Sequence, residues 1–483
     1  MIKSANIIYA ILILAIVHSI CAIAQNTAKL TIHLQNEDFG FVVLTAHINK
    51  YYHDEEDADR IVLKAGSDGR VDTTLSIIQP TLFSLRCAGR LLTPNLFIQD
   101  GDSVYIRIYK DKKDIPRIHF DGDRAEVNNF WPAFMEESRL AHMRNEAVSK
   151  DMVSISRAER IRKLVDYLRQ YVESYFEDID IPELVREAAD VWLSNTEATE
   201  YQNYIMDDYV VRIQYDEAPV IDSAAISVML KYPLDIHDKR YYRHELYIRS
   251  VTNYYSVRAG VRHANDLRDG TETRGLNYYI VDEILSIEDK ALRDMVMFGR
   301  IMLQLQIPRE DSRLFGKNLL DIFEPHFIDK NYFLAAKSRY DKNKKLMPGR
   351  KAPNVLLDED KTLSYYHGSP VLLHFWGTWC GSCLEEIPQL NILSKKYAQD
   401  LRIVNFAMEY SPPEKWKEYI DRYDLQGDNY YIANEDHDIM RSAFQVQYLP
   451  LYVVLDYQGT IVSISNTVGD GMISDAIERL LNP

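Results

Sequence analysis

Two cysteines three positions apart, Cys380 and Cys383, are the residues of this sequence best suited to chemistry. They follow the apolar run 371–376, which predicts a buried strand, and they precede a stretch that predicts a helix. The backbone N–H groups left free at a helix start, together with the helix dipole, stabilise negative charge. We therefore expect Cys380 to form a reactive thiolate. Cys383, one turn later on the same side, can attack a mixed disulfide made by Cys380, so the spacing predicts two-electron thiol–disulfide exchange.

Other uses of the cysteine pair compete with this interpretation. A zinc site needs about four ligands, usually a second close cysteine pair or two histidines. The remaining cysteines, Cys21 and Cys87, are each isolated in the sequence, and Cys87 is expected to be a small buried hydrophobe at the end of a strand. A peroxidase would need Thr or Ser three residues before its reactive cysteine, where this chain has Gly377. A static structural disulfide stays open as an alternative, and we expect no metal and no cofactor.

Several segments of the chain closely resemble thioredoxin-like thiol:disulfide oxidoreductases of the TlpA/ResA type. They are Phe-Trp-Gly-Thr-Trp-Cys at 375–380, Glu-Ile-Pro at 386–388, Ala-Pro-Asn-Val at 352–355 and Tyr-Leu-Pro at 448–450. The resemblance covers about residues 347–483 and implies a thioredoxin fold there. A looser resemblance links the β-rich N-terminal region to domains fused ahead of such modules in exported envelope proteins.

The resemblance implies a role for each matching residue. Cys380 would be the attacking thiol and Cys383 the resolving thiol. Glu386 would be the active-site acid that helps to move a thiol proton, with an ordinary first-turn charge as the alternative. Pro450 would hold its peptide bond cis, so that the neighbouring backbone can pair with an extended substrate. The substrate groove would involve Trp379, Leu449, Gly381 and Ser382.

Three positions depart from the pattern of that family. The pair Gly381–Ser382 lacks the usual proline before the second cysteine, which leaves the redox potential open. Leu451 follows Pro450 where Thr is common, which could alter the groove. His374 occupies the strand position where thioredoxins often bury an acid. It is either a proton shuttle for Cys383 or a core histidine whose polar atoms are satisfied.

The elements that must position these residues are strands alternating with helices. Strands are expected at 371–376, 402–408 and 430–433 and in a hairpin over 451–463, and helices at 388–397, 413–423 and 474–481. This order predicts a central sheet covered on both faces, that is, an α/β thioredoxin-like domain over 347–483.

The rest of the chain predicts two further regions. Short strands with turn residues every 8–12 positions predict a β-sandwich-like domain over 25–122. Apolar stripes at helical spacing predict an α-helical region over 123–346, in which the basic segment 342–345 is expected to be a linker. The chain is therefore expected to be multidomain.

The N-terminal segment and the charge indicate where the protein acts. Lys3, the apolar run 7–17 and the Ala-Ile-Ala motif at 22–24 predict a signal peptide over 1–24. We expect export to the periplasm or cell envelope, with no integral membrane segment after cleavage; an uncleaved anchor or a lipid on Cys21 are the alternatives. The net charge of −16 argues against nucleic-acid binding.

Two functions are compatible with the sequence. The first is an exported thiol–disulfide oxidoreductase that acts on protein thiols and disulfides; the family resemblance implies a reducing or isomerising role and a membrane-bound electron donor. The second is an envelope binding or scaffold protein, in which the large N-terminal part recognises a partner and the thioredoxin-like module is auxiliary.

Overall fold

The computed structural model describes residues 27–35, 41–46, 60–87, 90–112, 115–149, 154–217, 223–271, 274–358, 360–408, 411–432 and 437–482. The predicted signal peptide, with Cys21, lies outside these residues. The chain forms two compact units, one made mainly of Ala58–Tyr209 and Ala218–Tyr247 and the other mainly of Ile248–Pro483.

Among the described helices, none combines the length and the apolar character that crossing a membrane requires.

Within the described residues, two four-stranded sheets form a sandwich in the first unit. One sheet has the order β4 (Arg70–Ser76), β1 (Thr27–Leu34), β7 (Ser103–Lys110) and β8 (Pro116–Gly122). The other has the order β3 (Arg60–Lys64), β2 (Phe41–Ala46), β5 (Thr81–Cys87) and β6 (Arg90–Ile98). One apolar cluster draws on both sheets, including Ile32, Leu85 and the fully buried Cys87. The predicted sandwich and the burial of Cys87 are confirmed.

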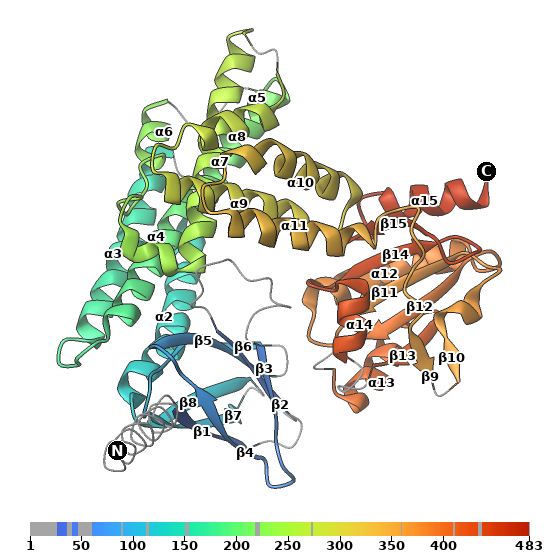
Figure 1. Ribbon diagram of the computed structural model, residues 1–483, viewed down its shortest axis with the longest axis horizontal. Coiled ribbons are helices and arrows are strands. Elements are labelled where there is room, and N and C mark those ends of the chain that lie inside the picture. Colours follow the sequence, from blue (N-terminus) through green and yellow to red (C-terminus); the bar gives the residue numbers. More distant parts are fainter. Residues whose placement is uncertain are drawn as a thin grey trace, which may run out of the picture. The chain divides into compact units, whose positions relative to one another are not determined.

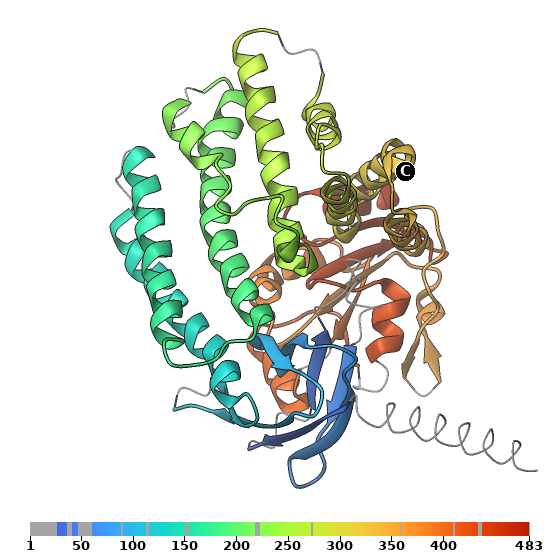
Figure 2. The ribbon, with the colours of Figure 1, turned by 60° about the vertical axis from the view of Figure 1, so that its left-hand side comes forward.

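The helices of the first unit begin directly after the sandwich. Helices α2 (Ala125–Ser149), α3 (Ser154–Tyr175) and α4 (Glu183–Ile205) lie side by side (Figures 1 and 2). The chain continues through η2 (Met206–Val211), α5 (Arg212–Gln214), α6 (Ser223–Met229) and η3 (Lys239–Arg243). The side-chain amide of Asn128 on α2 pairs with both backbone groups of Phe97 in β6, and that of Asn129 pairs with both groups of Phe120 in β8. These two amides attach α2 to both sheets.

Further helices follow from α7 onwards. They are α7 (Glu245–Arg268), α8 (Leu276–Leu285), α9 (Lys290–Gln306), α10 (Glu310–Phe323), η4 (Glu324–His326) and α11 (Lys330–Lys344). The linker expected at 342–345 is wrong, because α11 runs through it to Lys344. Asn343 is buried there and donates its side-chain amide to the carbonyl of Leu305, 2.6 Å away. Basic residues suit the last turn of a helix because its dipole is negative there.

The second unit ends in the predicted α/β domain, whose fold is confirmed. In the described residues its main sheet has the order β13 (Asp428–Tyr431), β12 (Arg402–Ala407), β11 (Val371–Trp376), β14 (Leu451–Leu455) and β15 (Ile461–Ser465) (Figure 1). Strands β11, β12 and β13 are parallel, whereas β14 and β15 are antiparallel to their neighbours. A small hairpin of β9 (Leu356–Asp358) and β10 (Lys361–Thr362), followed by η5 (Leu363–Tyr366), precedes the sheet.

Helices cover both faces of this sheet. Helices α12 (Gly381–Lys396) and α15 (Met472–Leu481) pack on one face, and α13 (Pro413–Arg422) packs against the same cluster. Helix α14 (His437–Phe444) packs on the other face. The central strand β11 is buried along its whole length, as the apolar run predicted. Such a rigid strand holds whatever follows its end in a defined place.

Candidate active site

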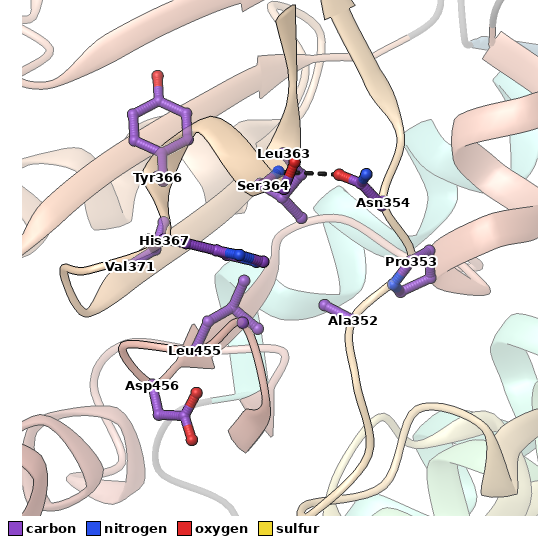
Figure 3. Close-up of a pocket in the computed structure, with 11 residues that line it drawn as sticks. Ala352, Pro353, Asn354, Leu363, Ser364, Tyr366, His367, Val371, Leu455 and Asp456 are labelled. Atoms are coloured by element: carbon purple, nitrogen blue, oxygen red, sulfur yellow. Dashed lines mark hydrogen bonds between the residues drawn. The ribbon is translucent and has the colours of Figure 1, made fainter.

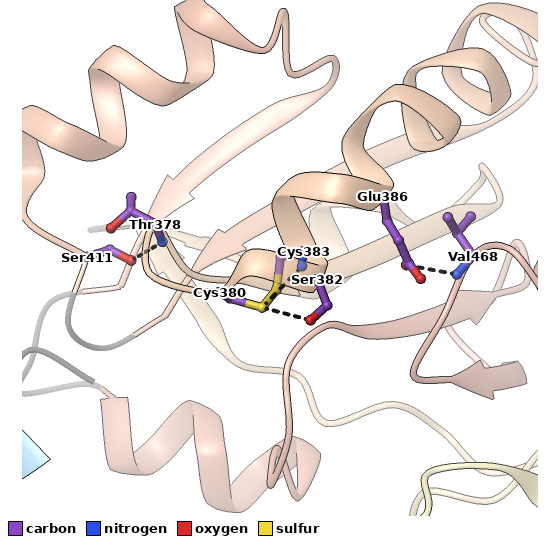
Figure 4. Close-up of a disulfide and its surroundings, with 7 residues drawn as sticks. All are labelled: Thr378, Cys380, Ser382, Cys383, Glu386, Ser411 and Val468. Carbon is purple, nitrogen blue, oxygen red and sulfur yellow. Dashed lines mark hydrogen bonds between the residues drawn. A yellow bond between two sulfur atoms is a disulfide. The ribbon is translucent and has the colours of Figure 1, made fainter. Parts of the chain in front are cut away.

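The cysteine pair lies where β11 ends and α12 begins. A tight turn, closed by the N–H of Cys380 donating to the carbonyl of Gly377 at 3.0 Å, leads from the strand to the helix. Cys380 is the N-cap of α12, and its sulfur accepts the N–H of Cys383 at 3.2 Å (Figure 4). The sulfur of Cys380 therefore takes up one of the backbone donors that a helix start leaves free.

The two cysteines are joined in a disulfide, with an S–S distance of 2.03 Å. Cys380 is 4% exposed and Cys383 is fully buried, so an incoming sulfur reaches Cys380 more easily. The exposed Ser382 places its hydroxyl 3.5 Å from the Cys380 sulfur, and Gly381 is exposed as well. Among the described residues, no cluster of three or more His, Cys, Asp or Glu side chains could hold a metal ion.

Pro450 lies at the same end of the sheet as the cysteines. The Leu449–Pro450 peptide bond is cis, as the family resemblance implied. Leu451, the next residue, pairs with Phe375 in β11, so Pro450 stands beside the strand end from which the cysteine turn departs. Leu449 packs against the apolar cluster that contains both cysteines. The geometry thus brings the predicted cis-proline segment to the cysteine pair.

Trp379, the residue just before Cys380, is 40% exposed. Its indole lies over Gly377, where an added Cβ would stand 2.8 Å from Nε1 of the indole. The neighbouring Thr378 is buried and donates its N–H to the hydroxyl of Ser411 at 3.1 Å (Figure 4). The turn therefore presents the Trp379 ring at the surface while its backbone is held in place.

Glu386 lies one turn beyond Cys383 on α12, but its carboxylate is held by a distant loop. It accepts the hydroxyl of Thr467 at 2.5 Å and the N–H of Val468 at 3.1 Å, both from the segment between β15 and α15. Figure 4 shows the Glu386 side chain pointing toward Val468. Burial, and after it the charge of Glu386, raise the pKa of the Tyr452 phenol far above its ordinary value. Glu386 and Tyr452 are therefore close neighbours.

His374 is fully buried in the middle of β11. Its Nδ1 lies 2.9 Å from Oδ1 of Asn405, whose amide nitrogen donates to the carbonyl of Gln426 at 2.9 Å. Because that second bond fixes the orientation of the Asn405 amide, we assign the ring proton of His374 to Nδ1. Among the described residues, Nε2 has no hydrogen-bond partner, so it is a bare acceptor inside the protein.

The surroundings of His374 keep it neutral. Burial lowers the pKa of His374 to about 4, and the hydrogen bond to Asn405 opposes this only in part. Its ring stacks on Tyr452, with the centroids 4.9 Å apart and the planes 5° from parallel. Side chains alternate along a strand, so His374 shares a face of the sheet with Leu372 and Trp376, which pack in the cysteine cluster. Its ring therefore lies on the cysteine side of the sheet.

Comparisons with known proteins agree with this arrangement. A family profile described as thioredoxin-like matches residues 368–461. The thioredoxin-like protein YneN of Bacillus subtilis is 30% identical over 125 residues, which are 25% of this chain and 71% of that protein. The thiol-disulfide oxidoreductase ResA of Geobacillus kaustophilus is 31% identical over 140 residues, 28% of this chain and 75% of that protein. The chain belongs to the thioredoxin-like thiol-disulfide oxidoreductases.

A solved structure can be set beside this oxidoreductase. The thioredoxin domain of a thiol-disulfide oxidoreductase from Bacteroides vulgatus is 21% identical, with a TM-score of 0.26. The match covers 28% of this chain and 99% of that domain.

A small pocket of the oxidoreductase lies away from the cysteines. Val371 and Leu455, which pair at the start of β11, form part of its wall. The opening segment 352–354 forms another part, where Oδ1 of Asn354 accepts the N–H of Ser364 at 2.8 Å (Figure 3). Since the cysteines follow the opposite end of β11, this pocket does not belong to the redox site.

The sequence did not single out three residues that touch the site of the oxidoreductase. Asn405 sets the tautomer of His374, Tyr452 stacks on the His374 ring, and Thr467 binds the Glu386 carboxylate. Asn405 could have been noticed as the single polar residue inside the apolar run 403–407. Tyr452 and Thr467 stand in ordinary strand and loop contexts, and their roles depend on contacts between segments far apart in the chain.

Proposed function

We propose that the chain is an exported enzyme that reduces or isomerises disulfides in protein substrates through Cys380 and Cys383. In the reduced enzyme, the Cys380 thiolate attacks one sulfur of a substrate disulfide. That S–S bond breaks, a mixed disulfide forms and the first substrate thiolate leaves. The Cys383 thiolate then attacks the Cys380 sulfur, which releases the second substrate thiolate and closes the enzyme disulfide. Two electrons pass from the dithiol to the substrate.

The observation that carries this proposal is the position of the Cys380 sulfur at the start of α12. There it accepts a backbone N–H at 3.2 Å and is the less buried of the two sulfurs. A sulfur at a helix N-terminus is stabilised as a thiolate, which makes it both a good nucleophile and a good leaving group.

The neighbouring residues have distinct parts in the proposal. Glu386 and His374 help to move the proton that Cys383 must lose before its thiolate attacks. The backbone beside Pro450 pairs with an extended substrate segment. Trp379, Leu449, Gly381 and Ser382 line the groove that receives it.

The proposals of export and of a membrane-bound electron donor rest on the sequence alone. The N-terminal segment 1–24 is proposed to direct the chain to the periplasm or cell envelope, where thiols are oxidised. An enzyme that reduces disulfides there needs renewed electrons, and a membrane-bound donor is the proposed source.

Insulin reduction by dithiothreitol tests the enzymatic proposal against the binding alternative. The chain should accelerate the reaction, Cys380→Ser should abolish the acceleration, and Cys383→Ser should accumulate a mixed disulfide. Cys87→Ser, which changes a buried cysteine of the sandwich, is the control and should leave the rate unchanged. No acceleration by the intact chain would favour a binding or scaffold protein. The reduction potential then decides direction: about −270 mV indicates a reductant and about −120 mV an oxidant.

A further inference from the structure

The corner between α9 and α10 touches the thioredoxin-like domain. Helix α9 ends at Gln306 and α10 starts after Arg309, because Ile307-Pro308 cannot continue the first helix. The N–H of Arg309 donates to the carbonyl of Ile307 at 2.8 Å, which closes the corner tightly. These helices and the thioredoxin-like domain belong to one compact unit.

The first contact of this corner is an ion pair with the loop that holds Glu386. Nη1 of Arg309 lies 3.2 Å from Oδ2 of Asp470. Asp470 also accepts the hydroxyl of Ser465 at 3.2 Å and the N–H of Met472 at 3.0 Å, so it ties both ends of the loop between β15 and α15. The donors that bind Glu386 come from the middle of that same loop.

The second contact reaches the cis-proline segment. The hydroxyl of Tyr448 lies 3.5 Å from Oε1 of Gln306, and Tyr448 stands two residues before Pro450. Arg339 of α11 is buried, and burial lowers its pKa to about 10. The charge of Tyr448 opposes this shift in part, so Arg339 lies near the Tyr448 side chain. The loop between β15 and α15 and the cis-proline segment are thus both in contact with the end of α9 and the corner that follows it.

We infer that Arg309 is a positioning residue of the redox site, which acts through Asp470 to set where the Glu386 carboxylate lies. The inference rests on the proposed role of Glu386 in moving the Cys383 proton. In the part of the chain that the structure describes, the Glu386 oxygens are held by the hydroxyl of Thr467 and the N–H of Val468, both outside its own helix. When Arg309 is lost, the loop is tied at fewer points, and Glu386 spends less time near the buried thiol.

The size of the effect is bounded by the exposure of the pair. Arg309 is 33% and Asp470 18% exposed, and partly exposed ion pairs contribute modestly. We therefore expect Arg309→Met to change the equilibrium constant between the Cys380–Cys383 couple and glutathione by about two- to fivefold near neutral pH. The pH dependence of this constant should shift toward that of Glu386→Gln.

The test measures this equilibrium constant against pH in the full-length chain, where no protein substrate is needed. Arg309→Met should have its effect in the wild-type background and none in the Glu386→Gln background. Arg309→Lys should retain most of the wild-type behaviour. Asp470→Asn, which keeps the loop's own hydrogen bonds but loses the charge, should reproduce the effect of Arg309→Met. Arg274→Met is the matched control, because it breaks the pair of Arg274 with Asp282 at 2.9 Å elsewhere in the unit.

The outcomes separate this inference from the proposed function. An equal effect of Arg309→Met with and without the Glu386 carboxylate, or no effect at all, overturns the positioning role. If insulin reduction is absent but the coupling between Arg309 and Glu386 is measured, the proposed function fails and the positioning role stands.

Discussion

Replacing His374 by leucine should remove a defined part of the dependence of stability on pH. In the folded protein the pKa of His374 is lowered by burial to about 4, against 6.5 for an ordinary histidine. Between these two pH values the unfolded chain binds a proton at this position and the folded chain does not. Stability therefore rises with pH across the window, and it is lost as the pH falls from 6.5 toward 4.

The magnitude follows from the size of that window. A difference of about 2.5 between the two pKa values corresponds to roughly 3.4 kcal/mol once the pH lies below both, at 1.36 kcal/mol for each pH unit. Between pH 7.5 and pH 5 the loss should be about 2 kcal/mol, because only part of the window is crossed. His374→Leu should lack this slope. Its stability at pH 7.5 can also change, since Oδ1 of Asn405 loses its partner, but that change does not depend on pH.

Native-state hydrogen exchange of the β11 and β14 amides at several pH values measures this slope within the sheet itself. The wild-type chain should lose about 2 kcal/mol more than His374→Leu between pH 7.5 and pH 5. His326→Leu, at an exposed position in η4, is the matched control and should keep the wild-type slope. Identical slopes for wild type and His374→Leu would show that His374 is charged or accessible in the folded state. In the same variant, thiol exchange near neutral pH should slow if His374 is the base for Cys383, and unchanged rates would exclude that role.

Three further substitutions give expected outcomes. Glu386→Gln should slow the resolving step and flatten its pH dependence, which stopped-flow reduction of a disulfide peptide would detect. Ser382→Ala removes a hydroxyl 3.5 Å from the Cys380 sulfur. Because the Cys380 thiolate then loses a hydrogen-bond donor, the reduction potential of the Cys380–Cys383 couple should fall by about 10–30 mV. Gly381→Ala is the control, since the Cβ that it adds meets nothing within 4 Å. Thr93→Val in β6 should stabilise the sandwich by about 1 kcal/mol, because the Thr93 hydroxyl is buried with no hydrogen-bond partner among the described residues. Denaturant titration measures this change, and a loss of stability would contradict the prediction.

Sequence patterns predicted the features that depend on residues adjacent in the chain. The start of α12 at the cysteine pair follows from an apolar strand, a short turn and a helical stretch that are adjacent in the chain. Turn residues between short strands predicted a sandwich-like β domain but not its pairing, since β3 and β4 follow each other in the chain and lie in different sheets. The cis bond at Pro450 was implied by the family resemblance alone.

Features that depend on distant contacts could not be predicted in this way. Glu386 is bound by residues more than 80 positions later, and no periodicity connects the two segments. The tautomer of His374 depends on an amide in the neighbouring strand. The segment 342–345 was misread because a run of basic residues is typical both of a linker and of a helix end; the burial of Asn343 against Leu305 decides for the helix.

His374 is a buried histidine at the strand position where the family resemblance leads us to expect an acid. A buried carboxylate at this position would repel a thiolate on Cys383, since like charges in a low-dielectric interior disfavour each other. A neutral imidazole adds no such charge, and its bare Nε2 can accept a proton instead. The nearby carboxylate of Glu386 lies on the helix and is held by a loop. The Glu386 carboxylate is bonded to that loop, and the loop is in turn bonded to Arg309 through Asp470.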